Sequence, residues 1–163
     1  MHVTTVQLTR DRERFMNFDA DEVFAENEDR FDCVDEHIDE ERDDDINTLI
    51  EYLGDAATSG TDDGVRWIEI DRERAVDLFV KPFHSFLSCI DDLKRNDLKD
   101  FATGGHDIET RLCALDNAYH FGGIYVIGEH PRACPISDWL RYVIHDADAP
   151  TRYYIRATYD GHQ

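Results

Sequence analysis

Carboxylates crowd the stretch from Asp19 to Asp45, which reads DADEVFAENEDRFDCVDEHIDEERDDD. More than half of its residues are Asp or Glu, and only Arg30 and Arg42 oppose them. An α-helix turns about 100° per residue. On that wheel the apolar side chains fall on one side and most carboxylates on the other; the apolar residues are Val23, Phe24, Phe31, Val34 and Ile38. The spacing predicts an amphipathic helix over about residues 21–42.

Such a helix would lose stability to its own charge. Like charges four residues apart, such as Glu36 and Glu40, each weaken a helix by a few tenths of a kcal/mol. Carboxylates near the C-terminal end also oppose the helix dipole. A surface that gives up stability in this way is a candidate binding surface. The predicted contact residues are Glu22, Glu26, Asp29, Asp32, Glu36, Asp39 and Glu40.

The net charge of −20 limits the possible partners. It exceeds what solubility requires, and it would repel the phosphates of nucleic acids and anionic membranes. Direct nucleic-acid binding and membrane binding are therefore not expected, and a basic protein or cations are. Salt adaptation is an alternative source of the acidity, because in a salt-adapted cell many proteins become acidic together.

Length and composition favour one globular domain over residues 1–163. Hydrophobic residues make up 41% of the chain, which is too many for a disordered acidic tail. The N-terminus lacks the pattern of a signal peptide, and no apolar run is long enough to span a membrane. The four cysteines are scattered without a disulfide framework. These features predict a cytoplasmic protein with reduced thiols.

The pattern of the chain predicts an α+β fold. Strands are expected at residues 2–8, 65–70, 123–128 and 151–159, with helices between them and a loop over 55–64. In the last strand, alternation places Tyr153, Ile155, Ala157 and Tyr159 on one face. Residues 83–93 form the helix with the most core-like pattern. We expect a small, mostly antiparallel sheet of about four strands with several packed helices, including the acidic one.

Motifs of the common enzyme classes are absent. The chain has no Walker A loop, GxGxxG, GxSxG, CxxC or HExxH pattern. No cofactor is expected, and a non-enzymatic role is favoured over an enzyme. One enzymatic alternative uses the pairs Cys33/His37 and His130/Cys134, which together could bind zinc. In another, His130 activates Cys134 near the start of a helix.

The leading function is that of an acidic inhibitor. Carboxylates on successive helix turns lie roughly 6 Å apart, close to the repeat of phosphates along a nucleic-acid strand. Such a helix can therefore occupy the basic cleft of a nucleic-acid-binding protein or nuclease. In size and acidity the chain is similar to the DNA-mimic proteins that act against restriction or CRISPR effectors, and in composition to the immunity proteins of nuclease toxins. A zinc- or cysteine-dependent enzyme and an acidic adaptor or salt-adapted domain stay open as alternatives.

Overall fold

In the computed structural model, which describes residues 2–13, 17–96, 98–104 and 106–162, seven strands form one mixed sheet. The strand order is β3-β4-β7-β1-β5-β6, and β2 also pairs with β7. β1 runs parallel to β5, and the other pairs are antiparallel. The strands are β1 (His2–Thr9), β2 (Cys33–His37), β3 (Ala57–Asp62), β4 (Val65–Ile70), β5 (Ile124–Ile127), β6 (Ala133–Pro135) and β7 (Arg152–His162).

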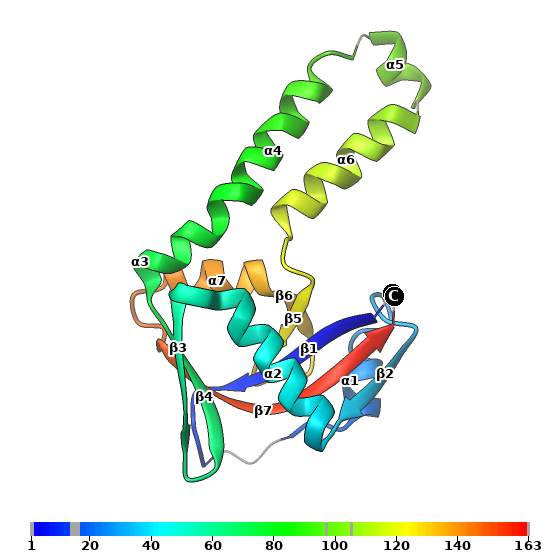
Figure 1. Cartoon of the computed structure of the whole chain (residues 1–163). Coiled ribbons are helices and arrows are strands. Elements are labelled where there is room, and N and C mark those ends of the chain that lie inside the picture. The colour runs from blue at the N-terminus through cyan, green and yellow to red at the C-terminus, as the bar shows by residue number, and fades with distance from the viewer. Residues whose placement is uncertain (1, 14–16, 97, 105, 163) are drawn as a thin grey trace.

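The helices fall into two groups, as Figure 1 shows. One group packs on the sheet, and the other forms a long arm that projects from it. The helices are α1 (Ala20–Ala25), α2 (Asp39–Leu53), α3 (Arg72–Ala75), α4 (Val80–Leu93), α5 (Leu98–Thr103), α6 (His106–Tyr119) and α7 (Ile136–His145). Two short 3-10 turns are η1 (Gly54–Ala56) and η2 (Val76–Phe79).

The α+β class is confirmed, but the sheet is larger than the predicted four strands, and it is mixed. The additional strands carry weak sequence signals. β2 reads CVDEH and β3 reads ATSGTD, so neither has a run of β-branched or aromatic residues, and β6 is only three residues long. Pairing with stronger neighbours makes these segments strands.

The predicted acidic helix over 21–42 is wrong. Its residues divide between α1, a turn, β2 and the first turn of α2. Val23, Phe31 and Val34 are buried as predicted, but they reach the core from separate elements, and Ile38 is 63% exposed. The division removes much of the like-charge repulsion that one continuous helix would bear, and it places Asp39 to Glu41 at a helix N-terminus, where the dipole favours them.

The sheet separates the core into two clusters, and a β-bulge in β7 lets this strand contribute to both. Val6 pairs with Thr158, whereas Leu8 pairs with Ile155, so β7 carries one extra residue between these pairs. The extra residue turns the side chains before and after it to opposite faces of the sheet. The four residues predicted to share one face therefore divide: Tyr153 and Ile155 join one cluster, and Ala157 and Tyr159 join the other.

Each face of the sheet has its own cover. α2 and α7 pack on one face through Ile46, Leu49, Leu140 and Val143, all of which are fully buried. α1 and the turn after it pack on the other face, where Val23 and Phe31 meet Tyr159. The Tyr159 hydroxyl donates a hydrogen bond of 2.6 Å to the carbonyl of Phe18, which holds the segment before α1 against the sheet.

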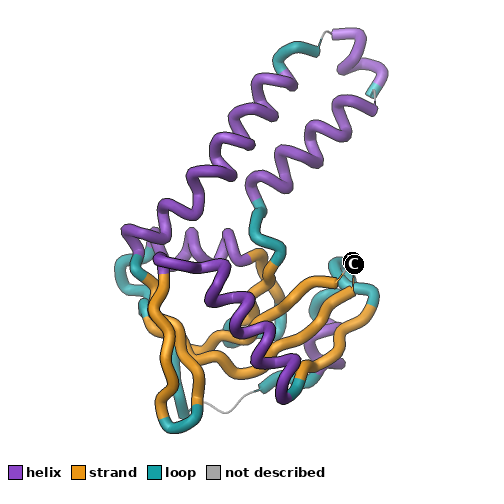
Figure 2. Tube along the Cα trace, in the orientation of Figure 1, coloured by secondary structure: helices purple, strands orange, loops and turns teal. Residues whose placement is uncertain are grey.

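The arm consists of α4 and α6 packed side by side, with α5 at the far end (Figure 2). The predicted core-like character of residues 83–93 is wrong, because no residue of α4 is buried. Its apolar side chains instead contact α6 and stay partly open to solvent; Phe83 is 57% exposed. The spacing of residues 83–93 does indicate a helix. Because α4 packs mainly against α6, most of its apolar face stays uncovered.

Asn27 holds the turn between α1 and β2. Its buried amide donates hydrogen bonds to the carbonyls of Val23 and Pro131, at 2.7 and 2.9 Å, and accepts one from the backbone N–H of Ala133 at 2.9 Å. We expect Asn27→Ala to lower the free energy of unfolding by about 2–3 kcal/mol, because it leaves buried backbone groups unpaired. Urea denaturation measures this change. The exposed Asn47 is the control, and a loss as large in Asn47→Ala would contradict the role given to Asn27.

Candidate functional site

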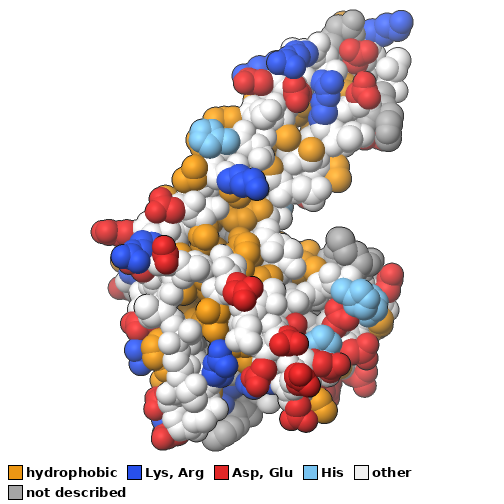
Figure 3. All heavy atoms as spheres, viewed as in Figure 1, with side chains coloured by type: hydrophobic (Ala, Val, Ile, Leu, Met, Phe, Trp, Pro, Cys, Tyr) orange, Lys and Arg blue, Asp and Glu red, His pale blue; other side chains and the backbone are white. Residues whose placement is uncertain are grey.

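The carboxylates of residues 19–44 form what we call the acidic surface. All fourteen are exposed: Asp19, Asp21, Glu22, Glu26, Glu28, Asp29, Asp32, Asp35, Glu36, Asp39, Glu40, Glu41, Asp43 and Asp44. Figure 3 shows a group of acidic side chains over β2 and the N-terminal part of α2, on the side of the molecule away from the arm. The next carboxylate in the chain, Asp45, is only 8% exposed and is not part of this surface.

The predicted contact residues come from four segments. Glu22 and Glu26 belong to α1 and its end, Asp29 and Asp32 to the turn, Glu36 to β2, and Asp39 and Glu40 to the first turn of α2. They therefore do not form a ladder on one helix face. Adjacent residues of a strand point to opposite faces, so the side chain of Glu36 points away from those of Asp35 and His37.

Two of the seven predicted residues have structural roles. Glu22 and Asp19 form a capping box at the start of α1, in which each side chain accepts a hydrogen bond from the other residue's backbone N–H. Asp29 forms an ion pair of 2.8 Å with Arg132. Within the described part of the chain, the remaining five have no side-chain hydrogen bond or ion pair: Glu26, Asp32, Glu36, Asp39 and Glu40. We call these the five unpaired carboxylates.

The two arginines of this segment do not neutralise it. The guanidinium of Arg42 donates hydrogen bonds to the backbone carbonyls of Ile155 and Arg156. The guanidinium of Arg30 lies over the ring of Tyr125, 5.9 Å from its centroid. Neither makes an ion pair with a carboxylate of the described residues. Apart from the ion pair between Asp29 and Arg132, the negative charge of the acidic surface is therefore uncompensated among the described residues.

The backbone of Asp39 adopts an uncommon conformation. Its φ is +49°, in the left-handed region that side chains other than Gly, Asn and Asp rarely occupy. The residue begins α2, and only Ile38 separates it from β2. Its carboxylate thereby lies at the N-terminus of α2, where the dipole of the helix favours negative charge.

The two Cys–His pairs predicted as an alternative site do not come together. Cys33 and His37 share one face of β2, but His37 Nδ1 lies 2.9 Å from Asp45 Oδ2 and is tied to α2. The His130 ring accepts a hydrogen bond from the backbone N–H of Arg132. Among the described residues, His37, His130 and Cys134 belong to no group of donors close enough to share a metal ion. The four residues considered as an alternative zinc site are therefore not brought together in the described structure.

The environment of Cys134 also opposes its predicted role as a nucleophile. Burial, and after it the negative charge of Asp138, raises the pKa of its thiol to about 11. The start of α7, two residues later, does not overcome this effect. The thiol therefore stays protonated at neutral pH, and the reactive thiolate is scarce.

Sequence reasoning missed a different group of donors around Cys33. His162 lies close to His2 and Asp160, and also to Cys33 and Asp35. The strand predicted over 151–159 in fact continues to His162, so Asp160 and His162 share one face of β7. The i, i+2 spacing of Asp160 and His162 is a signal of this arrangement, but their proximity to His2 and Cys33 depends on strand order.

An apolar pocket of about 320 Å³ lies where the arm meets the sheet domain. Aromatic rings from α4, α6 and the segments beside them line it, among them Phe79, Phe83, Phe86, Tyr119 and Phe121. Arg141 of α7 closes one side, with its guanidinium 3.9 Å from the centroid of the Tyr119 ring. The contact anchors the end of α6 to α7.

Comparison with protein-family models gave no match, and neither did comparison with curated proteins or with solved structures. The helices of the described residues are each too short or too polar to cross a membrane.

The difference between Cys134 and an exposed thiol can be measured. At pH 8 we expect iodoacetamide to modify Cys134 at least about tenfold more slowly than the exposed Cys113, because a raised pKa lowers the thiolate fraction. Peptide mass mapping over time gives both rates in one sample. The rates should converge in urea. Faster modification of Cys134 than of Cys113 in the folded protein would show that the thiol is activated.

Proposed function

We propose that the protein is a non-enzymatic acidic binding protein that inhibits a basic partner. The acidic surface would occupy the basic cleft of a nucleic-acid-binding protein or nuclease, as DNA-mimic inhibitors and nuclease-toxin immunity proteins do. The observation that carries the proposal is the orientation of Arg30 and Arg42. Both arginines contact the sheet, so neither pairs with the five unpaired carboxylates, which stay available to a partner.

The uneven distribution of charge supports a local function over general salt adaptation. Residues 19–45 hold fifteen acidic and two basic residues. The arm, residues 80–119, holds seven acidic and five basic residues, including all three lysines of the chain. Adaptation to salt would make exposed surfaces acidic throughout the molecule. A nearly balanced arm beside a strongly acidic surface instead favours selection at that surface.

Charge complementarity explains what such a surface would achieve. A dense group of carboxylates speeds encounter with a basic cleft and repels acidic competitors. The five unpaired carboxylates can form new ion pairs without first breaking internal ones. On the predicted single helix, all contacts would have come from one helix face. In the structure they would come from a strand, a turn and two helices. This broader surface matches a cleft rather than a narrow groove.

The first test reverses three unpaired carboxylates, Asp32, Glu36 and Glu40, to Lys. The protein is immobilised and exposed at low salt to lysate of its source organism. Duplex DNA and, separately, added salt are then tested for their ability to displace each captured protein. We expect capture of a nucleic-acid-binding protein that DNA displaces. Affinity for that partner should fall at least about 100-fold in the triple variant, since each close charge pair across an interface contributes about 1.5 kcal/mol or more.

A matched control makes the same change in net charge elsewhere. Glu51, Asp77 and Glu109 are exposed, lie outside the acidic surface and have no side-chain ion pair with a described residue. Reversing these three to Lys should leave partner affinity within about threefold. Equal losses of partner affinity in the two variants would show that affinity depends only on the net charge of the protein. Capture of no DNA-displaced partner at low salt would also count against the proposal.

The same variants predict a gain in stability. At low ionic strength the acidic-surface variant should melt at a higher temperature than the control. It relieves repulsion of a few tenths of a kcal/mol for each close pair of like charges, and together these pairs outweigh the favourable dipole interaction that Glu40 loses at the start of α2. Added salt should narrow the difference, since screening weakens exposed charges. Calorimetry at two salt concentrations measures both effects. A lower Tm of the acidic-surface variant at low salt would mean that these carboxylates stabilise the fold.

A further inference from the structure

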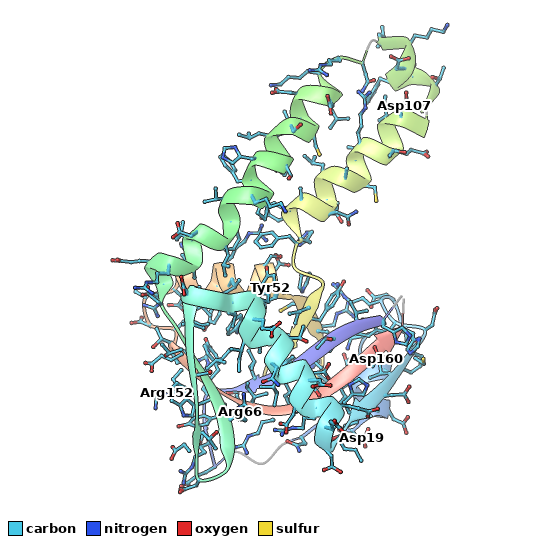
Figure 4. The ribbon with its side chains drawn as sticks, in the orientation of Figure 1. Asp19, Tyr52, Arg66, Asp107, Arg152 and Asp160 are labelled. Carbon is cyan, nitrogen blue, oxygen red and sulfur yellow. The ribbon has the colours of Figure 1, made fainter. Side chains whose placement is uncertain are left out.

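Three strands bring metal-binding side chains to one corner of the sheet. In the register of the sheet His2 of β1 pairs with His162 of β7, and His162 in turn pairs with Cys33 of β2. Two residues further in, Asp35 of β2 pairs with Asp160 of β7. Because alternate residues share a face and directly paired residues point the same way, all five side chains lie on the same face. Figure 4 shows Asp160 at this corner, near the end of β7.

Within each of two overlapping groups the donor atoms are close enough to share one ion. His2 Nδ1 lies 2.5 Å from Asp160 Oδ2, and His162 Nε2 lies 3.3 Å from the same oxygen. The rings of His2 and His162 are 4.0 Å apart between centroids. Donor atoms of Cys33, Asp35 and His162 also lie within 4.8 Å of one another. His162 belongs to both groups, and the side chains of Cys33 and His2 are exposed, so their rotation about a bound ion would bring the two groups together.

We propose that His2, Cys33, Asp160 and His162 bind a zinc ion, with Asp35 beside it as a hydrogen-bond partner or a fifth ligand. Zinc takes tetrahedral sets of thiolate, imidazole and carboxylate at about 2.0–2.3 Å, which places neighbouring donors roughly 3.3–3.7 Å apart. The distance between His162 and Asp160 already has this value. The side chain of His2 is 72% exposed and free to withdraw from its hydrogen-bond distance to Asp160.

The chemistry of the donors selects the class of metal. Calcium and magnesium prefer ligand sets made wholly of oxygen. A thiolate with two imidazoles and one carboxylate instead suits zinc, for which sulfur and nitrogen are ordinary ligands. As zinc binds, the Cys33 sulfur forms a bond to the metal and releases its proton to the solvent. The negative potential of the nearby acidic surface raises the local concentration of cations, and this favours capture.

The bound ion would join three strands that are otherwise linked here mainly by backbone hydrogen bonds. β2 gains most, because it pairs only with β7 among the described strands. The inference does not depend on the proposed partner, since the four ligands differ from the five unpaired carboxylates. It also accounts for Cys33, an exposed thiol with no hydrogen-bond partner among the described residues.

The test uses the full chain with any purification tag removed, because both chain ends lie near the cluster. After treatment with chelator, the protein is titrated with zinc chloride in excess magnesium. We expect calorimetry to show one saturable site. At a free zinc concentration about 100-fold above Kd, Tm should rise by roughly 5–10 °C. Cobalt(II) should bind in place of zinc and give a thiolate-to-metal charge-transfer band.

Single-ligand variants identify the site. His162→Ala should weaken zinc binding at least about 100-fold. Cys33→Ser should abolish the cobalt charge-transfer band and the greater part of the Tm rise. Cys33 and His2 are exposed, so Cys33→Ser and His2→Ala keep the test valid if His162→Ala folds poorly. Cys134→Ser and His130→Ala are matched controls that should bind zinc as the unchanged protein does.

Each other outcome contradicts the site or separates it from the proposed function. Loss of all binding in excess magnesium would show only diffuse attraction of cations to the acidic surface. Wild-type affinity in both Cys33→Ser and His162→Ala would place the metal elsewhere. The variant with Asp32, Glu36 and Glu40 reversed should keep its zinc site even though it loses the partner, so failure of one proposal is distinguishable from failure of the other.

Discussion

The bulge in β7 is the feature on which the rest of the structure depends. β7 is an interior strand of the sheet. It pairs with β1 on one edge and with both β4 and β2 on the other. One extra residue before Thr158 turns its side chains to opposite faces, which allows a single strand to supply two hydrophobic clusters. Arg42 of α2 donates hydrogen bonds to the carbonyls at the bulge, so the irregular backbone is satisfied from the helix above it.

This contact also explains the character of the acidic surface. Arg42 lies among the carboxylates in sequence, but its guanidinium donates hydrogen bonds to β7 and does not pair with them. Stability and surface charge are therefore supplied by the same helix, since the buried side of α2 packs on the sheet while its N-terminal turn stays acidic and exposed. A surface optimised for stability alone would place more basic residues there. The excess of carboxylates at this surface therefore favours a role in binding.

β2 connects the two proposals. Its residues alternate between a face that holds Cys33 and Asp35 beside His162 and a face that carries Glu36, and it lies between α1 and α2 in the chain. Carboxylates along a short edge strand also discourage pairing with another sheet. A metal ion at the start of β2 would stabilise the strand without using the carboxylates proposed for the partner. The arm is a separate feature, whose apolar side chains and lysines lie apart from this acidic region.

Local sequence determined much of what this protein is. The α+β class, the strands at residues 2–8 and 65–70 and the burial of Val23 and Phe31 follow from patterns that extend over a few residues. The density of charge in residues 19–45 was equally visible, because composition requires no knowledge of the fold.

Only the tertiary structure decided where these elements lie. Helical spacing in residues 21–42 favours one helix, but the pairing of β2 with β7 makes part of this segment a strand. The proximity of His2, Cys33 and His162 depends on which strands are neighbours, and contacts between distant parts of the chain leave no periodic signal in sequence. The same reason explains α4: its pattern showed an apolar face, but whether a sheet or one other helix covers that face is a property of the assembled molecule.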